Sequence, residues 1–406
     1  MKKVKFLLVL FIIALFTAWD VFAQQGIDPE YETIKSRVSY VPGVKVIRGE
    51  TRVIVPGHES FCPNGTVFKF NNGDIQVHDR RSSDGGKTWY KVEEMLEVSI
   101  YQYPEPDGEV LMFRSHEEHP LHIERGIPDA GRPEIRIIET SQKGVFEAKL
   151  LRSKDNGLTL TEEIAKIYLP EKLDDWSGVL NRKIVRMRDG SLLMSMYGTS
   201  EKRSQLRKVS AIRSTDRGKT WHYHSTIAIA GRKDREWVSR EGFNEPSLLV
   251  LPDGKILCFI RSGTSYQGSL GSHSNNDPSA NMPFGYHNAT PIYLSISIDG
   301  GRTWSNADPV TDFGVWPDAV LMENGIIAVS YGRPGNWLMF SPDGGDSFGP
   351  VIQFFNDLYP PDCGNYLSLS EVAPDILLAV YARTNPNNHW ESEIVGTYFH
   401  VKHVYE

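Results

Sequence analysis

The sequence predicts an all-β fold, and more narrowly a six-bladed β-propeller of four-stranded antiparallel blades. Two repeated patterns lead to this prediction. An octet of the form Ser-x-Asp-x-Gly-x-Thr-Trp recurs as SSDGGKTW (82–89), SKDNGLTL (153–160), STDRGKTW (214–221), SIDGGRTW (297–304) and SPDGGDSF (341–348). A strand–turn–strand pattern also recurs along the chain. Because the octets are unevenly spaced, they indicate repeats with loops of variable length and not a strictly periodic solenoid.

Each octet has the composition of a tight turn between two strands. Its Asp side chain can accept backbone N–H bonds inside the turn, and its Gly can adopt the positive φ that such turns require. The Ser and Thr hydroxyls can bond across the turn, and the Trp can anchor it in an apolar layer. We therefore expect the octets to be scaffold and their aspartates not to be catalytic.

The second pattern consists of alternating apolar residues on both sides of an Asn-Gly, Asp-Gly or Pro-Asp turn, which is the signature of a β-hairpin. The hairpins are predicted at 66–79, 183–198, 247–263, 319–333 and 368–383, with a weaker copy at 99–115. A hairpin, a third strand, an octet and a fourth strand make one blade, so these hairpins predict six blades. The segment TEEIAKIYL (161–169) is the one candidate for a short helix.

The first 23 residues predict a secretory signal peptide. They have a cationic start (MKKVK), an apolar run (FLLVLFIIALF) and small residues up to Ala23. The apolar run is short for a membrane span, so we expect no stable membrane anchor and a secreted or periplasmic protein. Residues 24–406 are then expected to form a single propeller domain.

Composition excludes several classes of partner and cofactor. The net charge is −7, and no basic stripe alternates with aromatic residues, so nucleic acid is not expected to bind. Cys62, Cys258 and Cys363 have no metal-ligand spacing and are expected to be free thiols. Three histidines fall within 115–134; a solvated loop is the favoured interpretation, and a metal cluster is the alternative. We predict no cofactor and no metal; the oligomeric state is left open.

Candidate site residues emerge when the hairpins are aligned by their turns. In a propeller the innermost strands begin near the central axis, where ligands bind. The residues nine positions before the turns are Asn64, Asn181, Glu245, Trp316 and Tyr366. Those that end the second strands include Arg80, Tyr197, Arg261 and Arg333, with Asp79 just before Arg80. Several Arg near one Glu and one Tyr predict a site for an anionic ligand.

The octet resembles the Asp box of the sialidase superfamily of six-bladed propellers. The segment FNEPSLLVLPDGKILCFIRSG (243–263) resembles the part of sialidases that carries a catalytic Glu followed by a carboxylate-binding Arg, which implies these roles for Glu245 and Arg261. NYLSLSEVAPDILLAVYAR (365–383) resembles the part that begins with the nucleophilic Tyr, which falls on Tyr366. GRPGNW (332–337) places Arg333 where a further clamp Arg is expected. The resemblance implies an exo-α-sialidase-like glycosidase.

The chemistry that this resemblance implies needs these residue types. A phenol becomes a nucleophile when a base removes its proton, a role that Glu245 would have. A tyrosine nucleophile avoids the repulsion that a carboxylate would meet at an anionic sugar, and planar Arg groups match a sugar carboxylate. Asp79 is the candidate general acid, although a turn aspartate is an equal alternative. Trp316 could stack on the sugar or pack in the core, and Asn64, Asn181, Tyr197 and Asp318 are further candidate binding residues.

One departure from the sialidase pattern keeps alternatives open. The stretch FCPNG (61–65) has no Arg where sialidases have Arg-Ile-Pro, so Arg80 or Arg52 would have to complete the clamp. This favours a related propeller hydrolase or lyase that acts on another sugar, such as a uronate- or rhamnose-containing polysaccharide. A non-catalytic carbohydrate-binding propeller is a third possibility. The combination of Glu245, Arg261, Arg333 and Tyr366 argues against it, because a binding module needs no base beside a phenol.

Overall fold

The computed structural model describes residues 43–59, 66–94, 96, 99–104, 107–114, 135–170, 178–198, 207–229, 242–262, 291–311, 314–332, 335–349, 351–355, 366–385 and 388–404. Every regular element within these ranges is a β-strand. None of the described segments forms a helix with the length and apolar character needed to cross a membrane. The predicted signal peptide lies outside the described residues.

Four of the sheets contain four strands each. The first consists, in order, of β2 (Val67–Lys69), β3 (Ile75–Val77), β4 (Arg80–Ser82) and β5 (Tyr90–Lys91), and the second of β16 (Asn244–Val250), β17 (Ile256–Arg261), β18 (Ile292–Ser297) and β19 (Asp308–Pro309). The third consists of β20 (Val315–Leu321), β21 (Ile327–Gly332), β22 (Asn336–Ser341) and β23 (Val351–Phe355). The last consists of β24 (Leu367–Ala373), β25 (Ile376–Asn385), β26 (Asn388–His403) and β1 (Val44–Glu59).

The remaining sheet is larger and has two antiparallel halves. One half consists of β6 (Ser99–Gln102), β7 (Val110–Arg114), β10 (Val145–Ser153) and β11 (Thr161–Tyr168), with β9 (Ile138–Glu139) beside β10. The other consists of β15 (Thr220–Ile229), β14 (Lys208–Ser214), β13 (Leu192–Gly198), β12 (Val179–Arg186) and β8 (Ile135–Arg136). A short parallel pairing of β11 with β15 joins the two halves.

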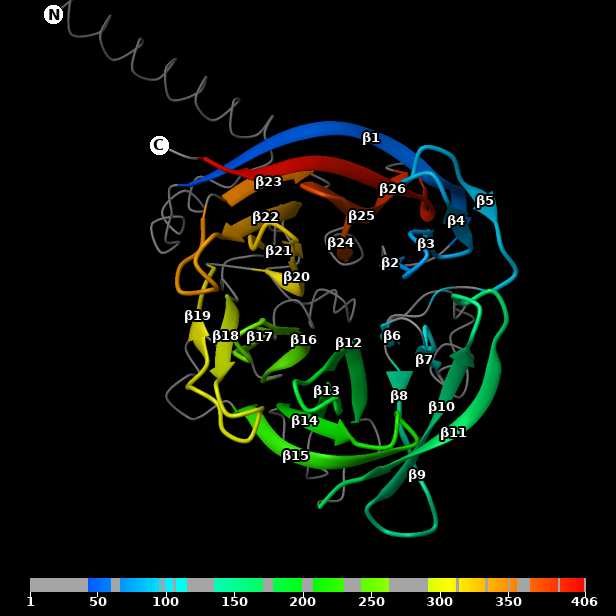
Figure 1. Ribbon diagram of the computed structural model, residues 1–406, viewed down its shortest axis with the longest axis vertical. Coiled ribbons are helices and arrows are strands. Elements are labelled where there is room, and N and C mark those ends of the chain that lie inside the picture. The colour runs from blue at the N-terminus through cyan, green and yellow to red at the C-terminus, as the bar shows by residue number, and fades with distance from the viewer. Residues whose placement is uncertain are drawn as a thin grey trace, which may run out of the picture.

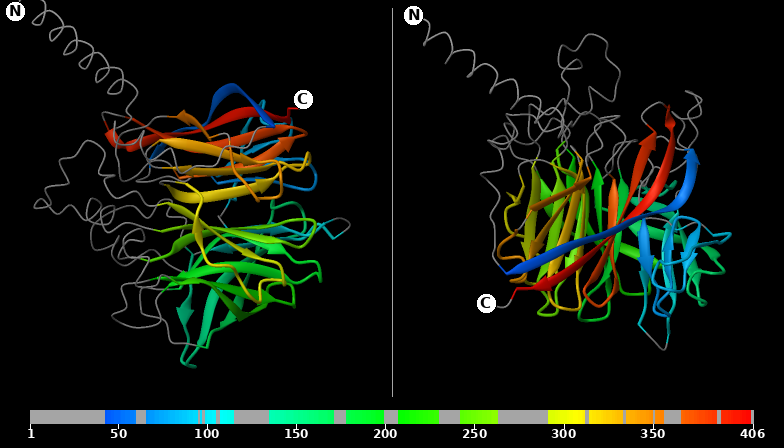
Figure 2. Two further views of the ribbon diagram at one scale, coloured as in Figure 1. Left: turned by 90° about the vertical axis from the view of Figure 1, so that its left-hand side faces the viewer. Right: turned by 90° about the horizontal axis from the view of Figure 1, so that it is seen from above.

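The sheets are arranged around a common centre, as in a β-propeller. Figure 1 shows β2, β6, β12, β16, β20 and β24 nearest to this centre, with the later strands of each sheet farther out. The side views show the sheets standing beside one another and not stacked in two layers (Figure 2). The predicted all-β propeller class is therefore confirmed.

The predicted hairpins form the two inner strands of the sheets. The pairs β2–β3, β6–β7, β12–β13, β16–β17, β20–β21 and β24–β25 are all antiparallel. The prediction of a helix at 161–169 is wrong, because residues 161–168 form strand β11. This segment pairs along its whole length with β10, and its inner side chains Ala165 and Ile167 are fully buried. Tertiary pairing here outweighs local helix propensity.

The ring is closed by strands from opposite ends of the chain. Strand β1 pairs antiparallel with β26, from Val44 opposite His403 to Glu59 opposite Glu391. As a result, the last sheet takes its outermost strand from the start of the described chain, and Figure 1 shows the two long strands side by side at the rim. This arrangement ties the first sheet to the last.

The octets form the turns between the third and fourth strands of the sheets, as the sequence predicts. In the first octet, Asp84 Oδ1 accepts the N–H groups of Lys87 and Thr88, each at 2.9 Å, and Asp84 Oδ2 accepts the Thr88 hydroxyl at 2.7 Å. Ser82 Oγ accepts the N–H of Gly86 at 2.8 Å. The Asp–Thr or Asp–Ser and Ser–Gly bonds recur in the other octets. These aspartates are saturated by their own turns, which explains the repeat as scaffold.

Apolar side chains fill the spaces between neighbouring sheets. Leu338 and Phe340 of β22 pack with Tyr381 of β25 and Phe399 of β26 in one such cluster. Further clusters lie between the other neighbouring sheets and between the halves of the large sheet. Burial of each large apolar side chain contributes roughly 1.5–3 kcal/mol, so these contacts are the main force that holds sheet against sheet. Cys258 is a buried free thiol in one cluster, while Cys62 and Cys363 lie outside the described residues.

We expect Asp84→Asn to lower the melting temperature in a pH-dependent manner. The Thr88 hydroxyl and N–H hold the pKa of Asp84 below its usual range, so folding favours the charged form. This stabilisation is complete above the unfolded-state pKa of about 4 and is lost as the pH falls through the lower folded-state pKa. Thermal unfolding followed by circular dichroism should show the difference from wild type shrinking as the pH falls below about 4.

Asp346→Asn is the matched control for this prediction, because Asp346 stands at a variable position of the fifth octet. Its exposed carboxylate pairs with Lys255 instead of bonding to the turn. We expect this variant to differ little from wild type at any pH. A melting temperature of Asp84→Asn that stays equally far below wild type in acid would contradict the assigned role of the charge.

Candidate active site

Glu245 lies at an irregularity in the inner strand β16. The register with β17 shifts between Asn244 and Ser247, and Glu245 adopts a φ of 44°. A positive φ is unusual for a residue other than glycine and is retained only where the surrounding structure enforces it. The bulge redirects the carboxylate, which is 4% exposed, toward side chains from other strands.

The Glu245 carboxylate accepts hydrogen bonds from three residues of three sheets. Arg261, at the end of β17 in the same sheet, donates from Nη1 to Oε1 at 2.5 Å. The Tyr366 hydroxyl, just before β24, donates to the same oxygen at 3.2 Å. The Trp316 backbone N–H on β20 donates to Oε2 at 3.1 Å. Arg261 Nη1 is also 3.4 Å from the Tyr366 hydroxyl, so the carboxylate, the guanidinium and the phenol form one connected group.

Trp316 occupies the equivalent bulge in the next sheet. The register between β20 and β21 shifts between Val315 and Asp318, and Trp316 has a φ of 52°. A proline follows both Glu245 and Trp316, and this shared feature was visible in the sequence. The Trp316 ring stacks on the Tyr366 ring, with centroids 4.6 Å apart and planes inclined by 24°. Trp316 is 1% exposed, so its ring supports the Tyr366 ring and is not accessible for stacking against a sugar.

Arg182 on β12 is a central residue that the sequence alignment missed. Its guanidinium lies 4.4 Å from the centre of the Trp316 ring, on a side chain that is 4% exposed. It donates to the backbone oxygens of Trp316 at 3.1 Å and Leu367 at 2.8 Å, and to Ser368 Oγ at 3.1 Å. Burial lowers the pKa of Arg182 to about 10. Arg182 therefore links the strands that carry Trp316 and Tyr366.

Asp318 compensates the buried charge of Arg182. Its Oδ2 lies 3.2 Å from Arg182 Nη1, and its Oδ1 lies 2.8 Å from Lys183 Nζ. The N–H of Leu369 donates to Oδ2 at 2.9 Å. Burial alone would raise the pKa of Asp318, but the two cations and this N–H outweigh burial and hold the pKa below its usual range. Both oxygens are thus occupied by protein groups, and a contact with substrate remains a prediction.

Two other predicted residues lie in the protein interior near this group. Asn181 is fully buried and donates from Nδ2 to the backbone oxygen of Pro246 at 3.0 Å, directly beside Glu245. The bulge with positive φ in β12 falls on Arg182, one residue after the position that turn alignment selects. Tyr197 is 3% exposed and packs in the apolar cluster between β12–β15 and β16–β18, with Arg207 5.7 Å from its ring centre.

The predicted residues of the first sheet are arranged differently. Asp79 lies in the turn after β3, and Arg80 begins the third strand β4 instead of ending the second strand as predicted. The two side chains are partly exposed and pair with each other at 2.9 Å. Arg52 on β1 donates to the backbone oxygens of Gly86 and Lys87 in the first octet, so it is committed to that turn and is not placed as a clamp residue. Asn64, Arg333 and the three histidines of 115–134 lie outside the described residues.

A cavity of ≈ 360 Å³ continues along the inner strands beyond this group. Its walls come from β2, β6, β12, β16, β20 and β24, and Arg182, Lys183 and Asp318 line it. The charged cluster of these three residues therefore lies between the cavity and the group around Glu245. A base, a phenol and a guanidinium in contact, supported by stacked rings, can deprotonate the phenol and stabilise the resulting negative charge.

Comparisons with known proteins agree with the turns and the fold. The model of the BNR/Asp-box repeat matches residues 212–223, which overlap the third octet. A search of curated proteins found no match.

Solved structures with a similar fold come from proteins of different kinds. A protein of unknown function from Dyadobacter fermentans is 18% identical, with a TM-score of 0.61 over 89% of this chain and 100% of that one. An α-L-arabinanase from Penicillium chrysogenum, complexed with arabinobiose, is 14% identical, with a TM-score of 0.56 over 86% and 98%. The NanB sialidase from Streptococcus pneumoniae is 11% identical, with a TM-score of 0.50 over 88% and 71%. The chain thus has Asp-box turns on a sialidase-like fold, and function must be argued from the site.

We expect Arg182→Met to lower the free energy of unfolding by about 3 kcal/mol, because it leaves the buried Asp318 with one cation fewer. Urea denaturation followed by tryptophan fluorescence measures this change. Arg186→Met is the matched control on the same strand, where the arginine is exposed, and should change stability by no more than about 0.5 kcal/mol. Equal effects of the two substitutions would show that the buried charge cluster does not hold the inner strands together.

Proposed function

We propose that the protein is a glycoside hydrolase that releases a terminal acidic sugar, sialic acid first, with retention of configuration. The observation that carries the proposal is the contact of the Tyr366 hydroxyl with Glu245 at 3.2 Å, with Arg261 against both. A phenol beside a buried carboxylate has an evident use as a nucleophile activated by a base.

In the proposed reaction, the Tyr366 oxygen attacks the anomeric carbon while Glu245 accepts the phenol proton. The bond from the anomeric carbon to the leaving oxygen breaks, and Asp79 is proposed to donate a proton to that oxygen. Water then attacks the glycosyl–tyrosine intermediate and gives its proton to Asp79. The departing Tyr366 oxygen recovers its proton from Glu245.

The remaining polar residues are proposed to bind the sugar. Arg261 and Arg333 would hold the carboxylate, as the resemblance to sialidases suggests, with Arg80 as the candidate third arginine. Asn64, Asn181, Tyr197 and Asp318 stay as candidate contacts, and Trp316 contributes by supporting the Tyr366 ring.

We further infer six blades, with the large sheet counted as two. Among the described residues, the strand pairing between its halves is limited to the short parallel contact of β11 with β15, and a hydrophobic cluster packs between them as between other neighbouring sheets. The predicted signal peptide supports a secreted or periplasmic enzyme whose single propeller domain follows residue 23.

A related hydrolase or lyase for a different sugar is the second candidate. Two observations favour it: the segment FCPNG lacks the expected Arg, and an α-L-arabinanase has a similar fold. A uronate- or rhamnose-containing polysaccharide is the substrate class to test in that case. A non-catalytic carbohydrate-binding propeller is disfavoured by the contact between Glu245 and Tyr366.

The first test is hydrolysis of a fluorogenic sialoside by wild-type protein and by Tyr366→Phe. We expect turnover by the wild type and a loss of at least about 100-fold in kcat for the variant, because the nucleophile is removed. Proton NMR of the first product should show the retained anomer. Tyr381→Phe, a buried tyrosine that bonds to Thr397 in the last sheet, is the matched control and should keep its activity.

Folded wild-type protein that does not cleave the sialoside would overturn the first candidate, and uronate- and rhamnose-capped oligosaccharides would then be tested. Equal activity of wild type and Tyr366→Phe would overturn the nucleophile assignment whatever the sugar.

Arg261→Lys should raise KM more than it lowers kcat. A lysine keeps the charge but loses the planar pair of N–H donors that fits a carboxylate. The measurement is KM of the wild type and of Arg261→Lys for the acidic glycoside and for its methyl ester. The substitution should raise KM for the acid more than for the ester, since the ester has no charge for Arg261 to bind. An equal rise in KM for both substrates would show that Arg261 does not contact the sugar carboxylate.

A further inference from the structure

A second pocket of ≈ 360 Å³ lies at the opposite end of the inner strands from Glu245. We name it the Tyr103 pocket, and its main lining residues are Tyr103, Asp107, Arg186, Leu192, Ser214 and Arg217. Arg186 is the last residue of β12, four residues after Arg182, which corresponds to about 13 Å along an extended strand. The pocket therefore lies on the turn side of the fold, between the two halves of the large sheet.

One residue that lines this pocket, Arg217, has an unusual backbone conformation for an arginine. It occupies the fourth position of its octet, where the backbone has a positive φ in all five copies: Gly85, Asn156, Arg217, Gly300 and Gly344. Gly and Asn tolerate this conformation, whereas an arginine is strained in it. Strain of this kind persists only where the surrounding contacts enforce it.

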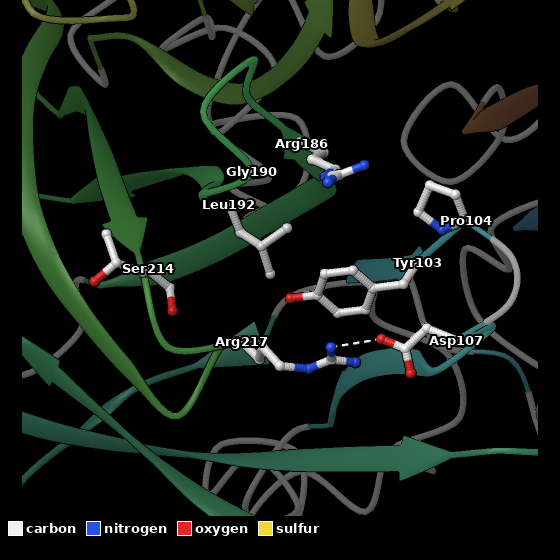
Figure 3. Close-up of a pocket in the computed structure, with 9 residues that line it drawn as sticks. Tyr103, Pro104, Asp107, Arg186, Gly190, Leu192, Ser214 and Arg217 are labelled. Atoms are coloured by element: carbon white, nitrogen blue, oxygen red, sulfur yellow. Dashed lines mark ion pairs between the residues drawn. The ribbon is translucent and has the colours of Figure 1, made fainter.

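The Arg217 side chain reaches across to the neighbouring half of the sheet. Its guanidinium pairs with Asp107 at 2.5 Å and with Glu109 at 2.8 Å, and it lies 4.1 Å from the centre of the Tyr103 ring. Figure 3 shows Arg217 and Asp107 joined below the Tyr103 ring. This contact fixes one wall of the pocket and orients the tyrosine.

Two polar groups remain available to a ligand. Tyr103 is 8% exposed, and its hydroxyl forms no hydrogen bond with the described part of the chain. The Arg186 guanidinium is exposed and has no ion pair among the described residues, and Figure 3 places it across the pocket from Asp107. Asp107 uses Oδ2 for Arg217, which leaves Oδ1 to accept from a hydroxyl.

We propose that the Tyr103 pocket binds an acidic saccharide unit, separately from the candidate active site. Arg186 holds its carboxylate, while the Tyr103 hydroxyl and Asp107 bond to ring hydroxyls. A singly charged carboxylate fits better than a phosphate, because Asp107 would repel a second negative charge. The choice of a saccharide rests on the proposed function. The pocket would tether a branched or polymeric glycan and raise its local concentration at the enzyme.

The experiment is a calorimetric titration of the full chain carrying Tyr366→Phe, so that ligands are not cleaved. The probes are trigalacturonate and sialyllactose, which distinguish a uronate from a sialic acid, with maltotriose as a neutral control. We expect one binding event for an acidic probe to weaken at least tenfold when Arg186→Met is added. Tyr103→Phe, which removes only the hydroxyl, should weaken the same event by a smaller factor.

Arg188→Met is the matched control, because Arg188 is exposed on the same β12–β13 turn but bonds to the backbone of Pro252. Isotherms for Arg186→Met that coincide with those for Arg188→Met would overturn the proposal, as would equal binding of maltotriose. The result is independent of catalysis. If no Arg186-dependent binding event is observed but the wild type cleaves the sialoside normally, only the proposal for this pocket is refuted. If the event is observed but the wild type cleaves nothing, only the proposed hydrolase function is refuted.

Discussion

Closure of the ring by β1 and β26 is the constraint on which the rest of the structure depends. The two strands pair over nearly their whole lengths although they come from opposite ends of the described chain. Bringing such distant segments together costs chain entropy, which the long ladder and the apolar clusters offset. Once the ring is closed, inner strands from different sheets are forced to meet at one centre. The candidate site exists only as a consequence of that meeting.

The centre of the ring concentrates both charge and backbone strain. Arg182, Glu245 and Trp316 have positive φ values in three different inner strands. The charges of Arg182 and Asp318 are buried and compensate each other. Buried ion pairs contribute little net stability but are costly to break, so they hold a geometry more than they strengthen a fold. That geometry is the stack of Arg182, Trp316 and Tyr366, which places the phenol against Glu245.

The two ends of the strands serve different purposes. At one end the octets satisfy their own aspartates inside the turns, and their residue types recur because every turn has the same hydrogen-bonding requirement. At the other end each strand contributes a different residue, because each faces different neighbours around the axis. At the fourth octet position, where the other four copies have glycine or asparagine, the third octet has Arg217, and this residue lines a pocket.

The sequence by itself determined the local structure: the hairpins, the octet turns and the all-β class follow from alternation and turn residues, which depend on near neighbours. It also singled out Glu245, Arg261 and Tyr366, which the structure brings into contact. Tertiary structure alone decided the role of Arg182, whose acceptors Trp316 and Leu367 lie 134 and 185 residues away in the sequence. It also placed the bulge of β12 at Arg182, one residue after Asn181, the position that the alignment of the hairpins selects. It likewise made residues 161–168 a strand, because pairing partners from β10 and β15 outweigh helix propensity. Such contacts are set by ring closure, and no local pattern encodes them.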